Sequence, residues 1–160
     1  MSRQQESPMR SVFSHRFTVP KSAIDLNGHV NNIEYLRWMQ DVATAHSAFC
    51  GWDIERYIET QSSWVVRSHH IDYLRPAYAG DALTLITWIA GFSGQTSPRR
   101  YVLRRDTDDQ ILARAETLWV YVDGRSGRPA EIPESFRECF DVITDETLAL
   151  AIARGRPVPA

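Results

Sequence analysis

The sequence has few cysteines, no excess of charge of either sign and no long hydrophobic run. Its two cysteines, Cys50 and Cys139, match neither a CxxC pair nor a metal-binding spacing, which argues against a disulfide framework and predicts two reduced, buried thiols. The longest apolar runs, such as residues 83–86, are far shorter than the roughly 20 residues that span a bilayer. The 18 basic and 20 acidic residues give a net charge of −2, whereas a dedicated nucleic-acid binder needs a basic surplus. We therefore expect neither a nucleic-acid partner nor a membrane partner.

Motifs that commonly mark metal or cofactor sites are also missing. The chain contains no GxSxG, GxxxxGK[ST], GxGxxG or HExxH sequence. The adjacent His69 and His70 would point to opposite faces of a strand and could not share a metal. The first ten residues are polar and show no secretory leader. These observations predict a cytoplasmic protein that uses no metal and no cofactor.

The length and composition indicate one globular domain. The chain has 160 residues, of which 43% are hydrophobic, and this is enough to form a core. No linker, repeat or block of like charge divides it. We predict a flexible N-terminus over residues 1–11, a folded domain over 12–143, and a C-terminal helix and tail over 144–160.

The strongest periodic signal is a long helix from residue 31 to residue 50. Asn31 followed by Glu34 predicts a capping box at its start, and Gly51 stands where a glycine would end it. Apolar residues recur every three or four positions from Ile33 to Phe49. This pattern indicates a largely buried helix.

The rest of the chain favours strands. A short strand is expected at 13–19, and the polar residues 22–32 indicate a loop. After the long helix we expect four more strands and then two short helices, at 64–74, 81–90, 99–105, 111–122, 133–140 and 144–153. Consecutive strands of this kind predict hairpin connections and an antiparallel sheet, with the long helix packed on one face. The predicted fold class is therefore α+β, an antiparallel sheet wrapped around one long central helix.

Polar residues concentrate in the segment from Asp25 to Asn32, directly before the long helix. Asp25 supplies a carboxylate that can act as nucleophile or as general base, and His29 is a titratable partner. The free amides near Asn31 and Asn32 can bind an oxyanion at the positive end of the helix dipole. The same composition also fits an Asx-rich turn that only caps a helix. Spacing leaves both interpretations open.

Three arginines stand at the predicted ends of strands. Arg75 precedes Pro76, and Arg99 and Arg100 begin a strand. Guanidinium groups bind phosphates well, so these side chains are candidates for holding a nucleotide-bearing substrate. Ordinary solvated surface charge is the alternative. The five tryptophans are expected to be core or interface residues.

The sequence DLNGHVNNIEY at residues 25–35, with IDYLRPA at 71–77 and the Gly-Asp pair at 80–81, resembles the hotdog-fold acyl-thioesterases. Within them it is similar to the 4-hydroxybenzoyl-CoA thioesterase-like group, which includes bacterial long-chain acyl-CoA thioesterases. The first motif also resembles thioesterases that act on acyl-carrier proteins. The resemblance implies a hotdog fold that assembles as a homodimer or homotetramer, with active sites at the dimer interface. It also implies hydrolysis of acyl-CoA, or of an acyl-carrier protein thioester, to a free carboxylic acid and a thiol.

The resemblance further implies roles for individual residues. Asp25 takes the place of the catalytic aspartate, and Asn27 and His29 would orient it or the attacking water. The backbone amide near Asn32 would form the oxyanion hole. The residues expected to bind the substrate are Asn31, Tyr35, Arg75, Arg99 and Arg100.

The chain also departs from its relatives. Thioesterases for acyl-carrier proteins place a Glu-Cys pair where this chain has Pro76-Ala77, so a mechanism that uses such a pair is ruled out. Hotdog enoyl-CoA hydratases share an Asp-x-Asn start, but their His follows five residues after the Asp, with a Pro between them. Here His29 follows Asp25 by four residues and stands after Gly28, which disfavours a hydratase. A hydratase and a non-catalytic acyl-thioester-binding protein are the two alternative functions.

Overall fold

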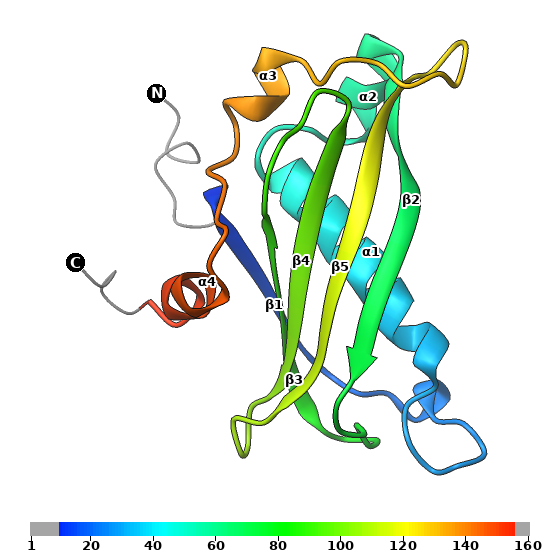
Figure 1. Cartoon of the computed structure of the whole chain (residues 1–160). Helices are drawn as coiled ribbons and strands as arrows, with labels where there is room; N and C mark the ends of the chain where they lie inside the picture. Colours follow the sequence, from blue (N-terminus) through cyan, green and yellow to red (C-terminus); the bar gives the residue numbers. More distant parts are fainter. Residues whose placement is uncertain (1–9, 156–160) are drawn as a thin grey trace.

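The computed structural model describes residues 10–155, and its centre is a five-stranded antiparallel sheet (Figure 1). The strands are β1 (Val12–Thr18), β2 (Ser62–Tyr73), β3 (Ala82–Ile89), β4 (Thr96–Arg105) and β5 (Ile111–Asp123). The helices are α1 (Asn32–Phe49), α2 (Ile54–Thr60), α3 (Glu134–Arg137) and α4 (Glu146–Ala153), and a 3-10 turn lies at Lys21–Ala23. The predicted α+β class, with one long helix against an antiparallel sheet, is confirmed.

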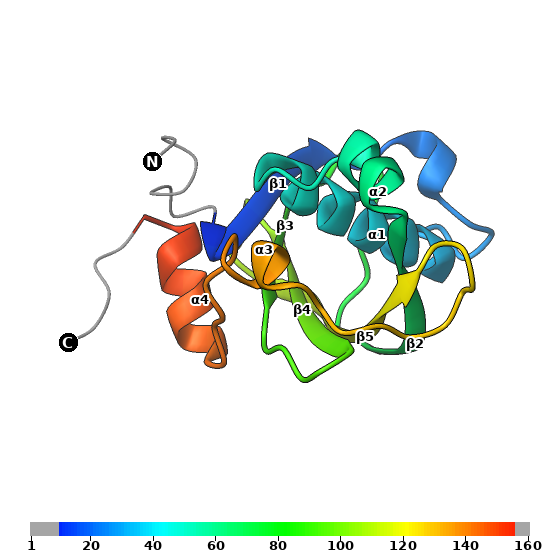
Figure 2. The same ribbon diagram turned by 90° about the horizontal axis from the view of Figure 1, so that it is seen from above.

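Helix α1 lies against one face of the sheet, behind the strands in Figure 1 and above them in Figure 2. Its two ends follow the predicted signals. Asn31 caps the start with its side chain, and Gly51 follows the end with a φ of +98°, a conformation that glycine adopts readily. The buried side of the helix, which includes Tyr35, Met39 and Val42, packs into a core shared with the inner face of the sheet.

The strand order, β1-β3-β4-β5-β2, corrects one expectation. The sequence predicts hairpins between all four strands after α1, but β2 pairs with β5 and not with β3. Residues 74–81 carry the chain from β2 past the ends of β5 and β4 to β3. At the start of this connection, the amides of Leu74 and Arg75 both donate to the Leu112 carbonyl oxygen on β5, at 2.8 and 3.1 Å. A connection of this length, interrupted by Pro76, does not form a tight hairpin turn. β2 therefore lies at one edge of the sheet.

Helix α4 covers part of the outer face of the sheet. Its Ala149 is fully buried, in a cluster with Val12, Ile86, Trp88 and Val102. The predicted helix at 144–153 is thus present and starts two residues later than expected. Residues 1–9 of the predicted flexible N-terminus and residues 156–160 of the predicted tail lie outside the described residues.

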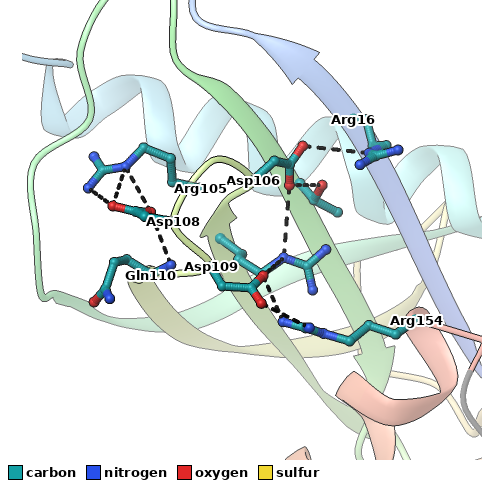
Figure 3. A network of polar contacts seen from close by, with 9 residues as sticks. Arg16, Arg105, Asp106, Asp108, Asp109, Gln110 and Arg154 are labelled. Carbon is teal, nitrogen blue, oxygen red and sulfur yellow. Dashed lines mark hydrogen bonds and ion pairs between the residues drawn. The ribbon is translucent and has the colours of Figure 1, made fainter.

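A polar network joins α4 to the turn between β4 and β5 (Figure 3). Both terminal nitrogens of Arg154 donate to the Asp109 carboxylate, at 3.0 and 2.9 Å. Asp106 in the same turn accepts the Thr84 hydroxyl at 2.7 Å and lies 3.6 Å from Arg16 on β1. Arg16 and Asp109 are well exposed, so these ion pairs fix geometry more than they stabilise the fold.

Helix α2, which begins soon after α1 ends, is not among the predicted elements. The Asp53 carboxylate caps it by accepting the Arg56 amide at 3.0 Å, and Gln61 ends it in the left-handed conformation with a φ of 51°. Asp53 directly before residues 54–60 is a signal in the sequence for the start of this helix. In the described part of the chain, no helix is long and apolar enough to cross a membrane.

Candidate active site

Residues 25–29 form a tight polar loop in front of α1. The Asp25 amide donates to the His29 carbonyl oxygen at 3.0 Å, and the Gly28 amide donates to the Asp25 carbonyl oxygen at 3.1 Å. Gly28 has a φ of +81°, which side chains other than hydrogen disfavour. The Oδ1 atom of Asp25 accepts the backbone amide of Asn27 at 2.8 Å. Within the described residues, a backbone amide therefore holds the carboxylate, and the side chains of Asn27 and His29 do not.

The first turn of α1 leaves one backbone amide without an acceptor. The Asn31 side chain accepts the Ile33 amide at 3.0 Å, and the Asn31 carbonyl oxygen accepts the Glu34 amide at 2.9 Å. The Asn32 amide has no hydrogen-bond acceptor among residues 10–155. This amide stands at the positive end of the helix dipole, where it can bind a developing negative charge.

The capping box predicted at this turn forms only in part. Asn31 caps α1 as expected, but its own amide donates to the Ala23 carbonyl oxygen at 2.9 Å and not to the Glu34 side chain. Glu34 lies instead 3.6 Å from Arg37, one turn further along the helix. The expectation that Glu34 is committed to capping is wrong, because the 3-10 turn supplies the acceptor that its carboxylate would have provided.

The two sequence segments that carry the family resemblance meet at this site. The Val30 amide donates to the Ala77 carbonyl oxygen at 2.9 Å, and both residues are fully buried. The Tyr73 hydroxyl donates to the Asn32 carbonyl oxygen at 3.2 Å. The end of β2 and the connection to β3 thereby hold the loop and the start of α1 in place through hydrogen bonds.

A shallow, open depression of about 560 Å³ lies over the loop. It is lined by Ile24, Asp25, Leu26, Asn27 and Asn31. Asn32 beside it is exposed, His29 is half-buried, and Leu26 projects fully into solvent. The structure thus brings Asp25, Asn27 and Asn31 together, on a surface that residues 10–155 leave open.

Tyr35 is not part of this surface. Its side chain is 3% exposed, and its ring packs edge-to-face on Tyr73 with the ring centres 5.0 Å apart. Burial raises the pKa of its hydroxyl. The expectation that Tyr35 touches the substrate is corrected: it does not line the depression and is a core residue, because the first turn of α1 buries Tyr35 and leaves Ile33 exposed.

The three arginines expected to hold phosphates do not gather in one place. Arg75 is exposed at the start of the connection that supports the loop. Arg100 lies on the outer face of the sheet, where it donates to Glu116 and to the Thr144 carbonyl oxygen, both at 2.9 Å. Arg99 points the other way and is 5% exposed, so neither surface charge nor surface phosphate binding describes it. Neighbouring residues of a strand face opposite sides, which is why the two adjacent arginines separate.

A second and more enclosed hollow, of about 340 Å³, lies at the other end of α1. It is bounded by the last turns of α1, by α2, by α3 and by the inner face of the sheet. Five aromatic residues line it, Trp52, Tyr57, Trp64, Trp119 and Phe136, and Arg99 is part of its wall. The sequence predicts core or interface positions for these tryptophans and gives no sign of the hollow, because residues from seven separate elements meet there only in the fold.

The thiols and possible metal ligands add no further site. Cys50 and Cys139 are free and half-buried, less enclosed than predicted. Among the described residues, no cluster of three or more His, Cys, Asp or Glu side chains is arranged to hold a metal ion.

Comparison with known proteins places these features in context. A family model, the thioesterase-like superfamily, matches residues 19–140. The chain is 25% identical over 138 residues to the L-carnitine dehydrogenase/betainyl-CoA thioesterase of Agrobacterium fabrum, covering 86% of this chain and 28% of that protein. It is also 25% identical over 118 residues to the long-chain acyl-CoA thioesterase FadM of Escherichia coli, covering 72% of this chain and 86% of that protein. The chain spans only 28% to 36% of the length of three of the curated relatives that it matches.

Solved structures share the fold. A variant 4-hydroxybenzoyl-CoA thioesterase, complexed with 4-hydroxybenzoyl-CoA, superposes with a TM-score of 0.76 at 20% identity, covering 82% of this chain and 99% of that one. The predicted hotdog fold is therefore confirmed.

Proposed function

Because the chain belongs to the thioesterase-like superfamily, we propose that it hydrolyses acyl-CoA thioesters to a free carboxylic acid and CoA. The relatives support a thioester substrate, since the names of the two curated relatives described above both include a CoA thioesterase. An acyl-carrier protein is the alternative carrier, and palmitoyl-acyl carrier protein thioesterases of plants match this chain at 26% identity.

The observation that carries this proposal is the pairing of a held carboxylate with an unused amide. Asp25 is fixed by the Asn27 amide, and the Asn32 amide lacks an acceptor within the described residues. Thioester hydrolysis needs a nucleophile or base on one side of the carbonyl and a donor for the oxyanion on the other. A segment that only capped the helix would need the Asn31 side chain, and it would not need the Asp25 carboxylate.

In the proposed mechanism, Asp25 acts by one of two routes. It attacks the thioester carbonyl to give a mixed anhydride, releasing the thiolate, and water then hydrolyses the anhydride. Alternatively it accepts a proton from a water molecule that attacks the carbonyl directly. In both routes the carbonyl oxygen becomes negative, and the Asn32 amide stabilises it together with the helix dipole. Asn27 and His29 would orient the carboxylate or the water.

Binding of the CoA phosphates is proposed for Arg75. Its side chain is exposed, and it belongs to the connection that supports the Asp25 loop. Arg100 is engaged with Glu116 on the far face and Arg99 is buried, so neither is suited to the same phosphates. Guanidinium groups bind phosphate oxygens through paired hydrogen bonds.

We also propose that the chain forms a homodimer or homotetramer that covers the open depression. Among the described strands, β2 pairs with β5 alone, and an edge strand offers its free backbone groups to another chain. Apolar side chains are exposed beside the loop and along this edge, among them Leu26, Ile33 and Val65. Light scattering after size exclusion should give a mass of at least twice 18.3 kDa; a mass of 18.3 kDa would contradict this.

The test of the proposed function is thiol release from a panel of acyl-CoAs, short to long and including benzoyl types. Because Ellman's reagent also reports Cys50 and Cys139, a control without substrate is subtracted. Enzymatic release of CoA with formation of the acid supports the proposal. Conversion of an enoyl-CoA to a 3-hydroxyacyl-CoA without thiol release would replace it with a hydratase. If the protein binds acyl-CoA but hydrolyses neither acyl-CoA nor an acyl-carrier protein thioester, it is a non-catalytic acyl-thioester-binding protein and the proposal fails.

A further inference from the structure

The inner face of β4 carries a buried arginine, Arg99, that has no acidic partner among residues 10–155. One terminal nitrogen of Arg99 lies 2.9 Å from His46 Nδ1 and 3.1 Å from the Thr87 hydroxyl. A guanidinium only donates, so His46 accepts through Nδ1 and is neutral in this contact. Among the described residues, no carboxylate lies within ion-pair distance of Arg99, although Arg100 next to it pairs with Glu116.

A buried charge of this kind is unfavourable unless a charge of opposite sign compensates it. Burial lowers the pKa of Arg99, and the neighbours that oppose this effect are the weak acids Tyr101, Tyr57 and Cys50. Burial raises the pKa of Tyr57 and of Cys50 to about 12, so both are neutral at physiological pH. Within residues 10–155, no ionised acid therefore balances the positive charge of Arg99, and the C-terminal end of α1 near His46 supplies only a partial negative charge.

The hollow of about 340 Å³ that Arg99 borders has room for a compensating group. Its volume lies in the range of small-molecule sites. The hydroxyls of Ser47 and Tyr57 are already bonded to each other at 2.7 Å. Asp53 is the carboxylate that lines the hollow, but it is exposed, caps α2 and forms no ion pair with Arg99. The wall also offers a free donor, since the buried indole N–H of Trp119 has no acceptor in the described part of the chain.

An aromatic wall by itself would also suit a quaternary ammonium group. The charge of Arg99 decides against a cation, because like charges repel strongly where water is excluded. It favours a ligand that brings an anion and an apolar body.

We infer that this hollow is a carboxylate-binding site, in which Arg99 pairs with the carboxylate of an acid whose ring or hydrocarbon body packs against the tryptophans. The acid has two possible sources. It is either a free carboxylic acid or the far end of an acyl chain, and the second source rests on the proposed thioester hydrolysis. The residues of α1 that line the hollow begin about 17 Å along the helix axis from Asn32, at a rise of 1.5 Å per residue.

Binding is measured first with free ligands, using the quenching of tryptophan fluorescence and calorimetry. The probes are phenylacetate, its neutral amide phenylacetamide and the cation benzyltrimethylammonium, which share a ring of one size. Phenylacetate should bind at least about tenfold more tightly than the amide, as expected for a charge-assisted hydrogen bond. Equal affinity for acid and amide, tighter binding of the cation, or no binding of any probe would overturn the inference.

Two variants assign the effect to Arg99. Arg99→Met removes the charge and keeps a similar volume, and it should abolish the preference for the acid while affinity for the amide changes less than about twofold. Arg100→Met, on the opposite face of the same strand, should leave the preference unchanged. Circular dichroism checks that both variants fold. A preference that survives in Arg99→Met would contradict the assignment, and the comparison of probes on the unaltered protein does not depend on either variant folding.

The last arm separates the two sources. The ratio of kcat/KM for an acyl-CoA with a terminal carboxylate to that for its methyl ester is compared between the unaltered protein and Arg99→Met. A ratio that falls at least about tenfold in the variant identifies the acyl chain as the source. An unchanged ratio, with acid binding intact, identifies a free acid. If no thioester is hydrolysed at all, the proposed function fails while the binding result stands.

Discussion

The two ends of α1 place polar groups in opposite surroundings. At the N-terminal end, Asp25 and the Asn32 amide lie beside an open depression that the described chain does not enclose. At the C-terminal end, Arg99 lies inside an aromatic hollow, against His46 in the last turns of the helix. The first end presents groups that can react with a substrate brought to them. The second presents a buried charge, which we infer pairs with the carboxylate of a ligand.

The helix dipole fits this division. Its positive end faces the depression, where an oxyanion would form, and its negative end lies near the Arg99 guanidinium. On the two proposals above, one helix serves two distinct anion sites: its free amide binds the first anion, and its C-terminal end favours the buried guanidinium that binds the second. If this division holds, the reaction takes place only at the N-terminal end of α1.

Asp25→Asn should have the largest effect. Turnover of the best acyl-CoA should fall at least about a thousandfold, because the amide is neither a nucleophile nor a base. The melting temperature should stay within a few degrees, since an asparagine oxygen can still accept the Asn27 amide. The matched control is Asp53→Asn at the other end of α1, where the carboxylate also accepts a backbone amide. Equal losses in both variants would erase the contrast between the two ends.

Gly28→Ala should have an intermediate effect, centred on the same loop. An added Cβ meets nothing within 4 Å, so the cost comes from the φ of +81° and should be about 1–2 kcal/mol of unfolding free energy. Urea denaturation measures this cost. Gly91→Ala is the control, because its Cβ would make only ordinary contact with Pro98 and its φ lies outside the left-handed region. A loss in Gly91→Ala as large as in Gly28→Ala would count against the strained loop.

Cys50 should report the enclosure of the C-terminal end without changing turnover. Burial raises its pKa from 9.0 to about 12, which keeps the thiol protonated. Alkylation by iodoacetamide at pH 8, followed by mass spectrometry, should be at least about tenfold slower than in unfolded protein. The same shift makes the folded state hold this proton longer than the unfolded state does. Its contribution to stability is therefore complete below pH 9 and declines between pH 9 and about 12. Alkylation at the unfolded rate would show that this end is open.

The sequence predicts the site at the N-terminal end of α1, but it does not predict the hollow at the C-terminal end. Asn31 and Gly51 mark the helix boundaries by local chemistry, and Asp25 stands in a recognisable motif, so these are visible in the sequence. The hollow depends on which strand lies next to which, and the pairing of β2 with β5 is not written in any local pattern. Arg99 was assigned to the surface because arginines usually lie there, and only the register of β4 turns it inward.

Tyr35 shows the same limit within a correctly predicted element. The spacing predicts the helix from residue 31 to residue 50, with an apolar stripe that starts at Ile33. In the structure Ile33 is 59% exposed and Tyr35 is 3% exposed. The helix packs on its sheet along a slightly rotated line, because the neighbouring rings of Trp38 and Tyr73 receive the tyrosine. Periodicity gives the helix, and packing chooses its face.

The central claim is that the free amide at the start of α1 stabilises the oxyanion, and replacing Asn32 tests it most directly. Proline is favoured at the first position of a helix, and Asn31 already has the extended conformation that precedes proline, with φ −62° and ψ 136°. Asn32→Pro therefore removes the N–H and keeps the helix, whereas Asn32→Ala removes only the side chain. We predict that kcat falls about a hundredfold or more in Asn32→Pro and stays within about threefold of the unaltered protein in Asn32→Ala, at equal melting temperatures. Full activity in Asn32→Pro would contradict the account.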